Sequence, residues 1–117
     1  GEVDLLYGIG AAPEGVITAT AVRALGGFFE GQLVFYDKEF ESRAQKMVGS
    51  DINKIWTAND LCTSDDTFFI ASGVCSGWVP GVRFVEDRAM VTSKIIFGGT
   101  GEVKLITNEY NLGGLDV

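Results

Sequence analysis

Tyr7–Gly15 reads YGIGAAPEG, and this stretch decides the fold expected for the first part of the 117-residue chain. It overlaps Val3–Ile9, an apolar and partly β-branched segment that predicts a buried strand. Apolar residues then repeat at helical spacing as far as Leu25, with Pro13 suited to the first helical turn. Gly26–Gly27 suits the end of that helix. The expected order is therefore strand, tight turn, helix.

The rest of the chain predicts more strands than helices. Strands are expected at Gln32–Tyr36, Lys54–Thr57, Thr67–Ser72, Val82–Val85, Met90–Phe97 and Val103–Asn108, a helix at Glu39–Val48, a turn or short helix at Ala58–Cys62, and a tail at Gly113–Val117. Strands alternate with helices first, and only strands follow. This pattern predicts an α/β fold, a mixed β-sheet with flanking helices that ends in an antiparallel pair. Without a repeat or a linker, residues 1–117 are expected to form a single α/β domain.

Composition excludes several classes of function. The net charge is −7, and such an acidic surface repels phosphate backbones, so no nucleic-acid partner is expected. No apolar run approaches the roughly 18–20 residues that cross a bilayer, and the first residues lack the pattern of a signal peptide. A cytoplasmic protein without membrane contact is expected. A small phosphorylated substrate stays possible, because backbone amides or a bound metal can hold an anion locally.

Histidine is absent and cysteine is scarce. Without histidine, neither a Ser-His-Asp triad nor a Cys-His pair nor histidine-ligated zinc can be built from this chain. Cys62 and Cys75 match no metal-finger spacing, so two reduced thiols are expected. Chemistry in this chain must therefore rest on carboxylates, hydroxyls, lysine, backbone amides or a metal held by oxygen ligands.

Glu14 is the candidate chemical group of the quoted stretch. It follows small residues and falls in the first turn of the expected helix, where the helix dipole stabilises a carboxylate. It could complement the dipole and nothing more, or it could bind a divalent cation, which prefers oxygen ligands. Spacing alone leaves both readings open.

A dinucleotide-binding turn is a rival interpretation. Gly8, Gly10 and Pro13 occupy the three positions of a GxGxxG fingerprint, and Asp37 ends the next expected strand, where a ribose-binding acid would stand. Proline at the third position departs from the fingerprint, because it crowds the contact between helix and strand. A nucleotide-binding α/β domain stays an alternative.

Four segments together resemble class II fructose-1,6-bisphosphatases over nearly the whole chain. They are Val3–Gly27 with its APEG sequence, Trp56–Leu61 (WTANDL), Ser64–Val74 (SDDTFFIASGV) and Val91–Ser93 (VTS). The first is the specific one, and it also resembles, more loosely, the strand and acidic helix near the C-terminus of lithium-sensitive, metal-dependent sugar phosphatases. The resemblance implies the C-terminal domain of that sugar phosphatase fold.

The resemblance implies a mechanism and two site residues. Family members use Mg²⁺ or Mn²⁺ to bridge the 1-phosphate and a water that attacks phosphorus. Glu14 matches the metal-binding glutamate of the APEG sequence. Ala11 matches a position close to substrate at which many relatives have glycine, and its methyl group leaves less room. The substrate implied is fructose 1,6-bisphosphate, in gluconeogenesis or the Calvin cycle, or sedoheptulose 1,7-bisphosphate in photosynthetic relatives, where the plastid stroma is a further possible location.

The other metal carboxylates of the family belong to an N-terminal portion that this chain lacks. We therefore expect the 117 residues alone to be inactive, with weak or absent metal binding. A non-catalytic binding or assembly domain derived from the enzyme is the main alternative. Apolar surface left by a missing half should be covered, so a homo-oligomer is expected. Asp60, Asp65 and Asp66 lie in polar turns and are expected to cap or solvate them.

Overall fold

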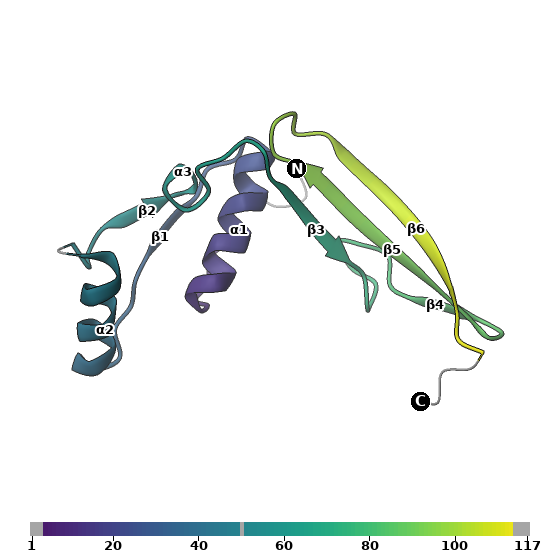
Figure 1. Ribbon diagram of the computed structural model, residues 1–117, viewed down its shortest axis with the longest axis horizontal. Helices are drawn as coiled ribbons and strands as arrows, with labels where there is room; N and C mark the ends of the chain where they lie inside the picture. Colours follow the sequence, from purple (N-terminus) through teal and green to yellow (C-terminus); the bar gives the residue numbers. More distant parts are fainter. Residues whose placement is uncertain (1–3, 50, 114–117) are drawn as a thin grey trace. The chain divides into compact units, whose positions relative to one another are not determined.

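The computed structural model describes residues 4–49 and 51–113, and the chain divides into two compact units (Figure 1). Unit 1 comprises Gly1–Arg23 and Gly27–Thr63, and unit 2 comprises Ala24–Gly26 and Ser64–Val117. The expectation of a single domain stays a prediction.

Unit 1 is built from helices and one short ribbon. Its elements are α1 (Ala12–Ala24, whose last residue belongs to unit 2), β1 (Glu30–Gln32), α2 (Lys38–Val48), β2 (Ile55–Thr57) and α3 (Ala58–Leu61). β1 and β2 form an antiparallel ribbon of three residue pairs. Asp37 caps the start of α2, and its carboxylate accepts a hydrogen bond of 2.9 Å from the backbone N–H of Phe40. This is the N-cap interaction that short polar side chains provide.

Unit 2 is an antiparallel sheet centred on β5 (Arg88–Phe97). β6 (Val103–Asn111) pairs with β5 from Arg88 to Ile96, whereas β3 (Phe68–Ser72) and β4 (Arg83–Val85) pair with different parts of β5. Figure 1 shows β5 between β6 and the two shorter strands. All three pairings of unit 2 are antiparallel, so this part of the chain matches the expected closing strands.

One face of the unit 2 sheet is covered by the segment between β3 and β4. Ile96 is fully buried and pairs with Phe69, whose ring lies 6.2 Å from the ring of Trp78. The Nζ atom of Lys94 lies 4.0 Å from the centre of the same Trp78 ring, which is a cation–π contact. Ile96, the largest fully buried side chain among the described residues, therefore lies on this face.

Ile96→Val should destabilise unit 2 by about 1 kcal/mol, because it removes one methylene from a fully buried side chain. Ile70→Val is the matched control, since Ile70 lies in the neighbouring strand but is 54% exposed. We expect the control to change the free energy of unfolding by less than about 0.5 kcal/mol. Urea unfolding followed by circular dichroism measures both. Equal effects of the two substitutions would contradict the placement of the core.

Most expected elements are confirmed within a few residues, and two expected strands are not. Residues 4–9 of the expected strand Val3–Ile9 have no strand partner, and Val3 lies outside the described residues. The expected strand Gln32–Tyr36 is also wrong, because β1 ends at Gln32. The expected mixed sheet is wrong as well, because every strand pair that the structure describes is antiparallel. The expected tail Gly113–Val117 lies outside the described residues beyond Gly113.

The physical reason is that a strand requires a neighbour for its backbone N–H and C=O groups. The apolar run that predicted a strand over residues 4–9 gives a preference for that structure, but it does not supply the partner. The α/β class itself is confirmed, with helices in unit 1 and an antiparallel sheet in unit 2.

Candidate functional site

Glu14 and Ala11 lie where α1 begins. The carbonyl oxygen of Ala11 accepts a hydrogen bond of 3.2 Å from the N–H of Gly15, which closes the first turn. Glu14 lies in that turn and is exposed, as is Ala11. Its carboxylate makes no hydrogen bond or ion pair that the structure describes, so its oxygens are open to solvent or to a ligand.

The donor set at this place suits one coordination position of a hard divalent cation. An exposed carboxylate is the oxygen ligand that Mg²⁺ and Mn²⁺ accept. Within residues 4–49 and 51–113, however, no three acidic or cysteine side chains come together as a metal site would require. Glu14 can therefore contribute one ligand, but the described residues do not gather a set of three such side chains around it.

The dinucleotide alternative loses its supporting residues in the structure. Asp37, the expected ribose-binding acid, is the N-cap of α2, and its Oδ1 atom is engaged by the N–H of Phe40. No strand precedes α1 in the described residues, although the fingerprint requires one. A Cβ atom at Gly8 would meet nothing within 4 Å. The turn therefore shows no close approach that would require glycine there.

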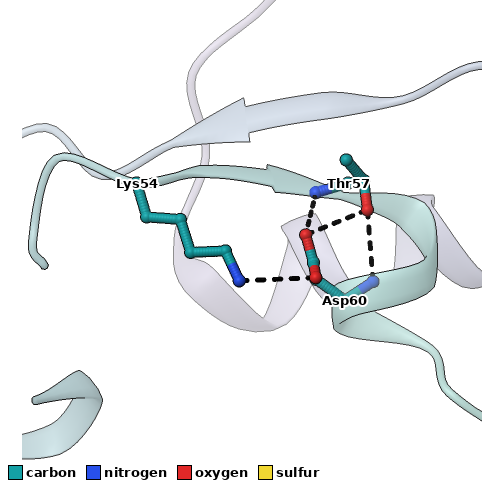
Figure 2. Close-up of polar contacts among 3 residues, drawn as sticks. All are labelled: Lys54, Thr57 and Asp60. Carbon is teal, nitrogen blue, oxygen red and sulfur yellow. Dashed lines mark hydrogen bonds and ion pairs between the residues drawn. The ribbon is translucent and has the colours of Figure 1, made fainter.

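Asp60 is held in a polar cluster at the start of α3 (Figure 2). Its Oδ2 atom accepts hydrogen bonds from the N–H of Thr57, at 2.8 Å, and from the Thr57 hydroxyl, at 2.9 Å. The Thr57 hydroxyl in turn accepts from the N–H of Asp60, which completes a capping box. Lys54 lies 3.3 Å from the other carboxylate oxygen. The expectation that Asp60 caps a turn is confirmed.

These contacts favour the ionised carboxylate and lower the pKa of Asp60. The backbone N–H of Thr57 is the largest cause, followed by the Thr57 hydroxyl, and the hydrogen bond and the charge of Lys54 each lower the pKa by less. A carboxyl whose folded-state pKa is lowered adds stability above its unfolded pKa, near 4, and loses it as the pH falls through the folded value. Unit 1 should therefore become less stable below about pH 4 in part because Asp60 is protonated.

Replacement of the two partners tests these causes. We expect both Thr57→Val and Lys54→Met to raise the pKa of Asp60, because each variant loses a group that stabilises the ionised carboxylate. The titration of the Asp60 carboxyl carbon, followed by NMR in the two variants and the parent chain, measures both changes. An unchanged pKa in either variant would show that the group it lacks does not stabilise the ionised carboxylate.

Sequence reasoning missed part of this cluster. It placed Asp60 in a turn but assigned nothing to Thr57 or Lys54, although T-x-x-D before a helix is a recognisable capping pattern. It also missed the contact of Lys94 with Trp78, which no local spacing indicates. Cys62 is a buried thiol and Cys75 is an exposed one.

The other two acids of the loop before β3 are placed as expected, in a polar turn. Asp65 and Asp66 are both exposed, and the N–H of Asp66 donates to the Ser64 hydroxyl at 3.0 Å. Within the residues that the structure describes, no helix combines the length and the apolar composition needed to cross a bilayer.

Comparison with known proteins identifies the family. The profile of "Bacterial fructose-1,6-bisphosphatase, glpX-encoded" matches residues 1–110. The chain is 43% identical over 105 residues to the D-fructose 1,6-bisphosphatase class 2/sedoheptulose 1,7-bisphosphatase of Prochlorococcus marinus (strain MIT 9515), covering 78% of this chain and 32% of the relative. The protein of the same description from Synechococcus sp. (strain RCC307) is 42% identical, with 78% of this chain and 31% of the relative covered.

The chain thus spans about one third of the length of these curated relatives and corresponds to their C-terminal part. The matched residues include Ala11, Glu14 and the polar cluster around Asp60. The chain belongs to the family of glpX-encoded, class II fructose-1,6-bisphosphatases.

Proposed function

We propose that this chain is the C-terminal domain of a metal-dependent sugar bisphosphatase that releases the 1-phosphate of fructose 1,6-bisphosphate. The observation that carries the proposal is the exposed carboxylate of Glu14 in the first turn of α1, inside the segment matched to the family. Matched relatives are described as acting on fructose 1,6-bisphosphate and sedoheptulose 1,7-bisphosphate. Either sugar bisphosphate fits the proposal.

Glu14 is proposed as one ligand of Mg²⁺ or Mn²⁺. A divalent cation, when bound, neutralises charge on the phosphoryl oxygens and lowers the pKa of a water nucleophile. The other residues of this chain position the glutamate: Gly15 closes the first turn on Ala11, and the hydroxyl of Thr18 donates to the carbonyl of Glu14 at 2.8 Å. The N–H of Ala11 is proposed to lie close to substrate, where helix amides favour an anion.

The remaining ligands are proposed to come from the N-terminal portion of the family's polypeptide. The complete protein is then expected to have the lithium-sensitive type of sugar phosphatase fold and to work as a homo-oligomer. Gluconeogenesis or the Calvin cycle is the proposed setting, in the cytoplasm or, for a photosynthetic eukaryote, the plastid stroma.

A joined protein tests the proposal. This joined protein consists of the part of the P. marinus MIT 9515 relative that precedes the matched region, followed by this chain. With Mn²⁺ present, we expect it to release phosphate from fructose 1,6-bisphosphate and the 117-residue chain alone to release none above background. A joined protein that unfolds cooperatively yet shows no metal-dependent turnover would contradict the proposed function. Turnover by the chain alone would contradict the need for further ligands.

A further inference from the structure

The segment Asp4–Ile9 has the sequence of a strand but no strand beside it. Its apolar side chains are almost fully exposed: Leu5 is 83% exposed, Leu6 79%, Tyr7 90% and Ile9 73%. A continuous apolar run of this kind is typical of a strand buried on both faces of a sheet. The described residues give it neither the pairing nor the cover.

The described residues of unit 1 form only a small core. The buried apolar side chains among them are all small, namely Ala19, Ala58 and Cys62. Their sheet is a ribbon of three residue pairs, and an isolated two-stranded ribbon is at best marginally stable in water. The described residues of unit 1 therefore do not bury Asp4–Ile9 on two faces.

We propose that Asp4–Ile9 is a strand of a β-sheet that the N-terminal portion of the family's polypeptide supplies, and that this pairing holds the start of α1 in place. The inference rests on the proposed function. The N-terminal portion can supply this sheet because the matched relatives contain about twice as much chain outside the matched region as inside it. Main-chain pairing gives such strand addition its affinity, and the apolar side chains give it cover on both faces.

Strand pairing would also order the site. Ile9 is separated from Glu14 by one short turn, so fixing the strand fixes where α1 begins. The same N-terminal portion would then supply both the sheet that positions Glu14 and the ligands that Glu14 lacks. Docking and completion of the metal site become one event.

Amide hydrogen exchange of Leu5 to Ile9 tests the inference in the 117-residue chain and in the joined protein. We expect exchange at nearly the rate of an unstructured peptide in the chain alone, and at least about 100-fold slower exchange in the joined protein. Unprotected amides in a joined protein that unfolds cooperatively would overturn the inference. Amides already protected in the chain alone would overturn it too, with dependence on concentration identifying a second copy as the occupant.

A matched pair of variants gives an independent readout. Leu6→Asp and Val74→Asp place a charge at sites that are 79% and 78% exposed in this chain. We expect Leu6→Asp to lower the unfolding temperature of the joined protein by about 5 °C or more and Val74→Asp to leave it unchanged. Equal effects would overturn the inference. If the joined protein does not fold, exchange of the aligned residues in the intact P. marinus enzyme decides the question.

Turnover separates this inference from the proposed function. Protected amides in a joined protein without Mn²⁺-dependent phosphate release would support the strand and contradict the function. Phosphate release without protection would contradict the strand and support the function.

Discussion

Glu14→Gln should lower kcat/KM for fructose 1,6-bisphosphate by at least about 100-fold in the joined protein when the assay contains saturating Mn²⁺. Loss of even an outer-sphere partner of a metal ligand typically costs 10–100-fold, and a ligand should cost no less. The amide keeps the shape of the side chain but removes its charge, so the helix itself is little disturbed. The expected signature includes a higher Mn²⁺ concentration for half-maximal activity, measured in the same phosphate-release assay.

Glu41→Gln is the control for the helix dipole. Glu41 is also an exposed acid in the first turn of a helix, α2, and complements the dipole in the same way. Such an interaction contributes about 0.3–1 kcal/mol to stability and nothing to catalysis. We expect the Glu41 variant to retain full activity. If Glu14→Gln did the same, Glu14 would complement the dipole and the proposed metal role would be wrong.

The sequence was sufficient for elements whose partners lie nearby along the chain. β3, β5 and β6 were predicted within a few residues, because each pairs with a strand of the same unit. α1 and α2 were predicted because local signals, Pro13 near one start and apolar spacing in both, fix a helix without outside help. The state of residues 4–9 was not predicted, since the pairing of a strand depends on residues far away in sequence.

The candidate site shows the same limit. Asp60 could be placed in a turn from its polar neighbours, and the capping pattern with Thr57 was available in the sequence. Asp37 was weighed as a ribose-binding acid because a strand was expected just before it. The structure ends β1 at Gln32 and makes Asp37 an N-cap. A misplaced strand boundary therefore changed the apparent chemistry of a carboxylate.

Gly73→Ala should destabilise unit 2 by about 3 kcal/mol, the upper end of the usual penalty for overpacking. Gly73 follows β3 and is buried, and its N–H donates to the carbonyl of Thr92 at 3.0 Å. A Cβ atom there would lie 2.0 Å from the carbonyl oxygen of Pro80 and 2.8 Å from its carbon. Both obstacles are backbone atoms, so relief requires the whole segment between β3 and β4 to move.

Movement of that segment would uncover the core face of the sheet, because Trp78 lies within it and packs on Phe69. We therefore expect the Ile96 amide of β5 to exchange about 100-fold faster in the Gly73→Ala variant of the joined protein. Gly77→Ala is the matched control in the same segment, since a Cβ atom there would meet nothing within 4 Å. The control should change the free energy of opening, as measured by exchange of the Ile96 amide, by less than about 0.5 kcal/mol. Equal rates in the two variants would mean that the segment does not hold the sheet face closed; a difference confined to Gly73→Ala would tie the stability of unit 2 to this one backbone contact.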